Sequence, residues 1–111
     1  MTLSQVEQLE FAAMDALVQK FLECADRLYP DGQTVEVLNI PPTKVTYEDG
    51  GMRVRHNGAT TGPERSILLD ILTLQEWRDT LFSVLDSRTQ DLKQRVTVAE
   101  DILKRMGKET A

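Results

Sequence analysis

The chain has few of the residues on which disulfide frameworks and metal sites depend. Its 111 residues include one cysteine, Cys24, and one histidine, His56. A single cysteine excludes an intrachain disulfide, and one cysteine with one histidine cannot build a zinc site without several carboxylates. Cys24 lies among apolar helix positions, where a thiol is inert. We therefore predict no metal site and no cofactor.

Long hydrophobic runs are also missing. No apolar run approaches the ~18 residues that a membrane helix needs. The first ten residues hold two glutamates and no lysine or arginine, whereas a secretory signal begins with basic residues and an apolar run. We expect a soluble, intracellular protein, most simply a cytoplasmic one, with no membrane association.

The sequence does not offer the groups that enzymes commonly use. His56 lies beside Asn57 and Gly58 at a strand end, where we expect it to be solvated rather than to act in acid–base catalysis. The segment 57–62 lacks the lysine and the spacing of a phosphate-binding loop. With no nucleophile and base in recognisable spacing, we predict no catalytic residues and a protein that is not an enzyme.

Basic residues are fewer than acidic ones, 13 against 18, and the formal net charge is −5. Residues 1–32 hold six acids and two bases, so the acidity belongs to the first segment. This charge disfavours non-specific binding of nucleic acid by the whole chain. It leaves open an acidic decoy that occupies a basic groove on a nucleic-acid enzyme and inhibits it. The acidic side chains of that hypothesis are Glu7, Asp15, Glu23 and Asp26.

A long helix is predicted over residues 3–29, which contain neither glycine nor proline. Ser4 and Glu7 have the spacing of a capping box, and Pro30 begins the stop signal. At about 100° per residue, two rows of apolar side chains cover more than half of the helix surface. A helix packed on one surface needs less, so we expect two neighbours or a partner chain.

The segment 33–57 changes to a strand pattern and predicts a β-hairpin or a three-stranded meander, followed by a loop over 58–63. Asp49, Gly50 and Gly51 tolerate the positive φ of a tight hairpin turn. The core side is expected to carry Val45, Tyr47, Met52 and Val54, and the opposite side Lys44, Thr46, Glu48, Arg53 and Arg55. The basic residues suggest an alternative function as a nucleic-acid-binding module. Its contacts would be Lys44, Arg53, Arg55 and, after the loop, Arg65.

The region 64–107 is predicted to be helical. Thr61 with Glu64 and Thr73 with Glu76 both have capping-box spacing. They indicate a short helix or strand over 66–72, of which we favour the helix, and a longer helix over 74–106. The longer segment is either one helix or a helical hairpin broken near residues 86–89. Gly107 is the expected stop.

A seven-residue repeat runs through this last helix and predicts a coiled-coil seam. Its two positions are occupied by Phe82, Thr89, Val96 and Leu103, and by Leu85, Leu92, Ala99 and Met106. An unbroken helix of this length would extend ~50 Å and require an intermolecular contact. The partner-binding residues would be Trp77, Phe82, Leu85, Leu92, Val96, Leu103 and Met106.

Together these patterns predict a single α+β domain over residues 1–111, with a long first helix, a central β-hairpin or meander, and one or two C-terminal helices. We interpret the chain as a non-catalytic protein that binds another protein or itself through its helices, as a small adaptor, assembly factor or inhibitor does. The partner in the simplest case is a second copy, forming a homodimer.

Overall fold

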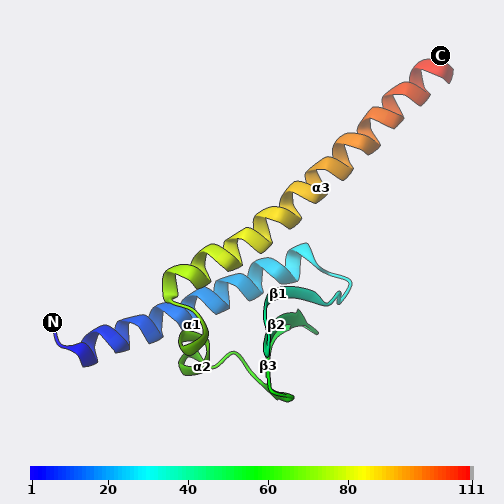
Figure 1. Ribbon diagram of the computed structural model, residues 1–111. Coiled ribbons are helices and arrows are strands. Elements are labelled where there is room, and N and C mark those ends of the chain that lie inside the picture. The colour runs from blue at the N-terminus through cyan, green and yellow to red at the C-terminus, as the bar shows by residue number, and fades with distance from the viewer. Residues whose placement is uncertain (111) are drawn as a thin grey trace.

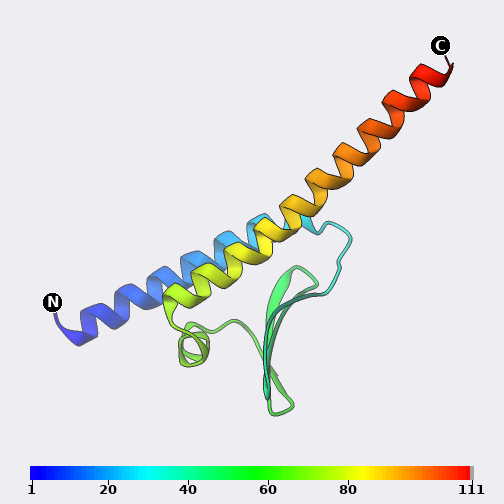
Figure 2. The same cartoon turned by 45° about the horizontal axis from the view of Figure 1, so that its top comes forward.

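Two long helices lie side by side and run in the same direction, with a small sheet and a short helix along one side of the pair (Figures 1 and 2). The computed structural model describes the backbone of residues 1–110 and the side chains of residues 1–107. The helices are α1 (Leu3–Leu28), α2 (Arg65–Ile71) and α3 (Leu74–Thr110), and the strands are β1 (Val35–Ile40), β2 (Thr43–Glu48), β3 (Gly51–His56) and β4 (Ala59–Thr61). This order confirms the predicted α+β class.

The capping box of helix α1 lies two residues earlier in the chain than predicted. Thr2, not Ser4, is the N-cap: its Oγ1 accepts from the Gln5 amide at 3.2 Å, and the Thr2 amide donates to Gln5 Oε1 at 2.7 Å. Glutamine serves in place of glutamate because its side-chain oxygen accepts the same bond. The helix ends at Leu28, and its buried face consists of Met14, Val18, Phe21 and Ala25.

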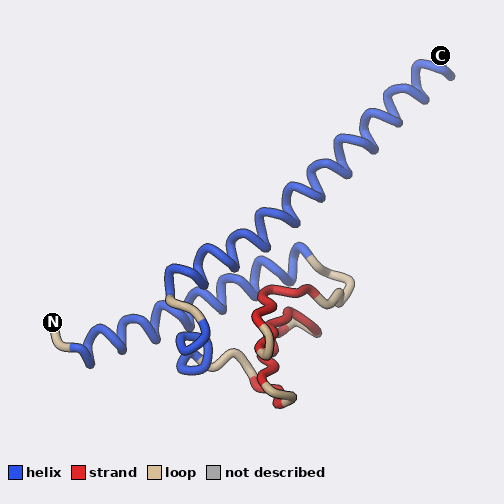
Figure 3. Tube along the Cα trace, in the orientation of Figure 1, coloured by secondary structure: helices blue, strands red, loops and turns tan. Residues whose placement is uncertain are grey.

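The four strands form one antiparallel sheet in sequence order (Figure 3). The predicted hairpin turn is correct: Asp49 and Gly50 have φ values of 52° and 77°, and Glu48 pairs with Gly51 across it. The predicted loop over 58–63 is wrong in part, because Ala59–Thr61 form β4 on the edge of β3. The tight turn at Asn57, with φ of 51°, returns the chain early enough for this pairing.

One face of the sheet supplies much of the core, as the alternation predicts. Val45, Tyr47, Met52 and Val54 are all buried against the helices. On the opposite face Thr46 is also buried, contrary to expectation, since its cross-strand neighbours Glu36 and Arg53 flank it on both sides.

Tyr47 joins the sheet to α1. Its ring meets Phe21 edge-on with 6.1 Å between centroids, and its hydroxyl donates to Asp26 Oδ1. Burial, the hydrogen bond to Asp26 and the charge of that carboxylate together raise the pKa of Tyr47 to about 12. In the folded chain the Tyr47 hydroxyl therefore stays protonated, and donates to Asp26, well above neutral pH.

The predicted short helix is present as α2, but only one of the two predicted capping boxes in this region forms. Thr73 and Glu76 cap α3 reciprocally, with bonds of 3.1 and 3.2 Å. Thr61 lies in β4, so it cannot cap α2, and Glu64 makes no side-chain cap bond. Thr61 pairs with Val54 of β3, so it is not available as the N-cap of α2.

Helix α3 is one continuous helix of 37 residues, which decides against the helical hairpin. It also passes through Gly107, which is therefore not the predicted stop. Glycine is open to helical φ and ψ, and it ends a helix only where the chain turns left-handed. The radius of gyration is 18.7 Å, whereas a compact chain of this length has about 13 Å. Much of α3 lies outside the packed body.

Candidate interaction surface

The first half of α3 supplies the other side of the core. Trp77 and Leu81 are fully buried and Leu85 nearly so, at the spacing that keeps side chains on one face of a helix. The Trp77 Nε1–H donates to the Leu68 carbonyl of α2 at 2.6 Å. This inner face of α3 packs against α1 along the length that the two helices share.

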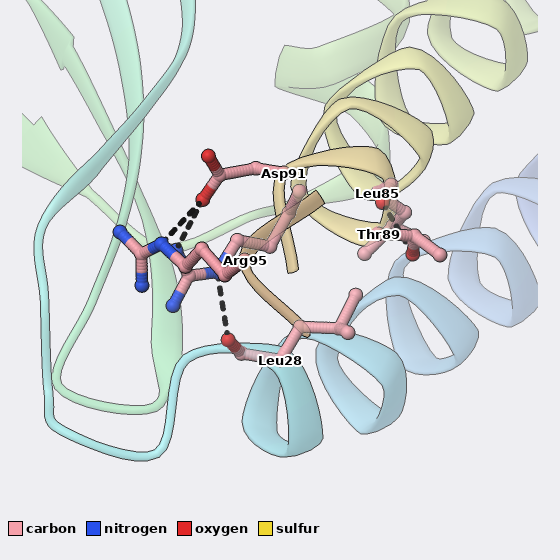
Figure 4. Close-up of polar contacts among 6 residues, drawn as sticks. Leu28, Leu85, Thr89, Asp91 and Arg95 are labelled. Carbon is pink, nitrogen blue, oxygen red and sulfur yellow. Dashed lines mark hydrogen bonds and ion pairs between the residues drawn. The ribbon is translucent and has the colours of Figure 1, made fainter. Parts of the chain in front are cut away.

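The shared length ends at a junction between Arg88 and the last turn of α1. The Arg88 Nε–H donates to the Leu28 carbonyl at 3.0 Å, and the guanidinium lies 4.7 Å from the centroid of the Tyr29 ring. Asp91 then accepts from Arg88 and Arg95, both at 3.3 Å (Figure 4). Arg88 thereby caps the negative end of α1, and past this junction α1 no longer covers α3.

The inner face of α3 continues beyond the junction as an exposed apolar surface. We call it the distal apolar face and define it by Leu92, Val96, Ala99, Ile102, Leu103 and Met106. Val96 is 56% exposed, Ile102 53%, Leu103 70% and Met106 53%. Among the residues that the structure describes, no other element lies against this half of α3 (Figures 1 and 2).

A shallow hollow marks the place where α1 ends and the distal apolar face begins. Its volume is about 480 Å³, and it is lined by Leu28, Thr89, Leu92, Lys93, Val96 and Thr97. The Thr89 hydroxyl donates to the Leu85 carbonyl at 2.9 Å, so its methyl group can face an apolar neighbour without leaving a polar group unpaired. The hollow can accept one more large apolar side chain.

The seven residues predicted to bind a partner fall into three groups. Leu92, Val96, Leu103 and Met106 lie together on the distal apolar face. Trp77 and Leu85 are buried in the core of this chain, so the prediction that they contact a partner at the surface is wrong. Phe82 is 45% exposed but lies among Asp79, Ser83 and Asp86 on another side of the helix.

The heptad pattern misplaced Phe82 because an ideal straight helix drifts by ~20° per heptad from a strict seven-residue repeat. It also missed Leu81, in the core, and Ile102, on the exposed face. Trp77, Leu81 and Leu85 follow one another at intervals of four residues, a spacing that predicts the buried face of α3. A face three positions wide per heptad, as in globular helices, would have included Ile102.

The basic residues proposed to contact nucleic acid are only partly gathered. Lys44 and Arg55 are cross-strand partners, and Arg53 follows on the same sheet face. Arg55 is paired with Glu48 at 3.3 Å. Arg65 lies at the start of α2, where it bonds to Asp15 of α1 at 2.9 Å, so its guanidinium is held at α1 and not with the other three.

The four acidic residues do not share one surface. Asp15 is held by Arg65, and Asp26 accepts the hydrogen bond of Tyr47. Glu7 and Glu23 are exposed, but at 3.6 residues per turn they lie ~160° apart around α1. A single acidic face for a basic groove is therefore not formed by this set.

The sole histidine lies at a second hollow, of about 390 Å³, between the β1–β2 turn, the end of β3 and α2. Its Nδ1 is 2.6 Å from Thr43 Oγ1, and Asp70 also lines the hollow. The described residues include no group of three or more His, Cys, Asp or Glu side chains placed to hold a metal ion. Among the described residues, the hollow thus contains the hydrogen-bonded pair His56 and Thr43 but no recognisable set of catalytic side chains.

Comparison with known proteins finds no match for this chain among family models, curated proteins or solved structures. None of the described helices is long and apolar enough to cross a membrane.

Proposed function

We propose that this protein is a non-catalytic interaction protein that binds a helical partner through the distal apolar face of α3. The observation that supports it is the continuation of one helix face from a packed core into an uncovered surface. Monomeric proteins rarely leave contiguous apolar surface of this kind exposed. A helix with apolar positions at intervals of three and four residues suits a partner helix.

The energy available to such contact is moderate. Full burial of a Val, Leu, Ile or Met side chain contributes ~1.5–3 kcal/mol. Val96, Ile102, Leu103 and Met106 are each about half exposed or more, so each has ~1 kcal/mol left to gain, or about 4 kcal/mol for the four. An apolar partner would gain a similar amount on its own side. Association itself costs ~4–15 kcal/mol, which places the contact among weak or regulated interactions.

The experiment uses a photo-reactive phenylalanine analogue at position 103, with the same analogue at position 82 as the matched control. Both positions are exposed on α3, at 70% and 45%, but only residue 103 belongs to the distal apolar face. The probe is irradiated in the purified full chain and in an extract of the cells that produce it. We expect polypeptide adducts at position 103 in at least one of the two preparations and none at position 82.

The adducts must also depend on the apolar surface itself. The substitution Val96→Lys places a charge in the middle of that surface, where its burial against an apolar partner is unfavourable. It should abolish the adducts at position 103 while leaving the circular dichroism spectrum unchanged, because Val96 makes no core contact. Absence of adducts at position 103 in both preparations, or adducts that persist in the Val96→Lys chain, would overturn the proposed function.

A further inference from the structure

Resting on the proposed function, we infer that the occupant of the distal apolar face is the same face of a second copy, and that the two α3 helices pair antiparallel. Three features of the chain lead to this occupant: the place where α1 ends, the layers that the face can form with itself, and the charges beside those layers.

The end of α1 decides the direction of the second helix. Up to Arg88 the inner face of α3 is occupied by α1, and the hollow beside Leu28 begins where α1 stops. In a parallel pair, α1 of each copy would lie between the two α3 helices at the level of Leu85, and the helices would have to diverge. An antiparallel helix instead continues along the line that α1 vacates, so over residues 89–106 each level of α3 has one helical neighbour.

The layers of this antiparallel pair are apolar and alternate in size. With Val96 opposite Ala99 of the second copy at the centre, Leu92 meets Leu103 and Thr89 meets Met106. The small side chain of Ala99 permits close approach at the centre. At each end Met106 of the second copy enters the hollow lined by Leu28 and Leu92, which is where an additional apolar side chain is accommodated.

The charges that flank the layers select this register. In it, Lys93 of each copy faces Glu100 of the other, which forms two symmetric ion pairs. A shift of one heptad in either direction places Glu100 against Glu100 or Lys93 against Lys93, so both shifts are repelled. Neither side chain makes an ion pair among the described residues, so both are available.

Local charge also permits two copies to approach here although the chain as a whole is acidic. Residues 89–107 hold four basic and three acidic side chains, whereas the chain has a net charge of −5. The two-fold axis thus passes through a nearly neutral surface, and the acidic α1 helices lie toward the two ends of the pair. Charge complementarity of this kind sets partner and orientation more than affinity.

The test is a charge exchange measured by sedimentation velocity on the full chain, from about 10 µM to about 1 mM, the range suited to a small interface. Lys93→Glu and Glu100→Lys should each weaken dimerisation about tenfold, because each places like charges together at two symmetric positions. An equimolar mixture of the two variants should dimerise as well as the unaltered chain, since every pair in the mixed dimer is again opposite in sign. Arg105→Glu, on the same half of α3 but away from the layers, is the matched control and should have no effect.

Other outcomes would overturn the inference in distinguishable ways. A parallel pair places Lys93 near Arg88 of the second copy, so Lys93→Glu would strengthen dimerisation instead of weakening it. A trimer or larger species, or a monomer throughout the concentration range, would also contradict the antiparallel pair. A monomer that still forms adducts at position 103 in the cell extract would remove the second copy as occupant and leave the proposed function standing.

Discussion

Replacement of Arg88 by methionine is the sharpest test of how α3 is attached to the rest of the fold. Only 12% of the Arg88 side chain is exposed, and it bonds to the Leu28 carbonyl, stacks on Tyr29 and pairs with Asp91. A hydrogen bond from a charged donor contributes ~1.5–3 kcal/mol, a cation–π contact ~0.5–2 and a partly exposed ion pair ~0–1. Methionine keeps part of the apolar stem, so we expect Arg88→Met to lower the free energy of unfolding by about 2–4 kcal/mol.

The assay is urea unfolding followed by the fluorescence of Trp77, which is the single tryptophan and is fully buried. With a urea dependence of ~1–3 kcal/mol per molar, the midpoint of Arg88→Met should fall by about 0.7–4 M. The control is Arg95→Met, since the Arg95 side chain is 66% exposed and pairs with the same Asp91 at the same 3.3 Å. It should change the free energy by less than about 0.5 kcal/mol. Equal effects of the two substitutions would refute the reasoning, because Arg88 would then be worth no more than a surface ion pair.

Two further substitutions test the core. Trp77→Phe removes the donor to the Leu68 carbonyl and leaves a cavity, so it should cost about 3 kcal/mol and lower the thermal midpoint by about 10 °C in circular dichroism; a shift below ~3 °C would contradict this account. Tyr47 has a pKa raised from 10.0 to about 12, so its contribution is complete below pH 10 and is lost as the pH rises through 12. The difference in stability between the unaltered chain and Tyr47→Phe, obtained by urea unfolding at each pH, should therefore shrink over that interval, and a difference independent of pH would contradict the raised pKa of Tyr47.

The sequence indicated the elements of this fold well where one local signal had no competitor. The first helix has no glycine or proline and a strong stop, and it was predicted to within one residue at its C-terminal end. The turn at Asp49 and Gly50 followed from the backbone freedom that a two-residue hairpin turn demands. The core side of the hairpin followed from strict alternation.

Errors arose where tertiary contacts compete for the same residue. Thr61 has capping-box spacing, but it pairs with Val54 of β3 and is therefore part of strand β4. Trp77 resembles an interface anchor by its size, yet it is fully buried in the core of this chain and donates to the Leu68 carbonyl of α2. Sequence alone could not divide the apolar positions of α3 into packed and uncovered halves, because the division depends on where α1 ends in space and not on any feature of α3 itself.

The uncovered half of α3 also affects how the chain behaves when it is alone. Most of the stability of a helix in a protein comes from tertiary packing, and among the described residues beyond Leu92 this helix is supported by its own turns and by exposed pairs such as Arg105 with Asp101. Its backbone amides should therefore exchange with solvent much faster than those around Leu81 in the protected first half. A partner that covers this segment would suppress that opening, so part of its binding energy would be spent on helix order and the amide exchange rates would report occupancy directly.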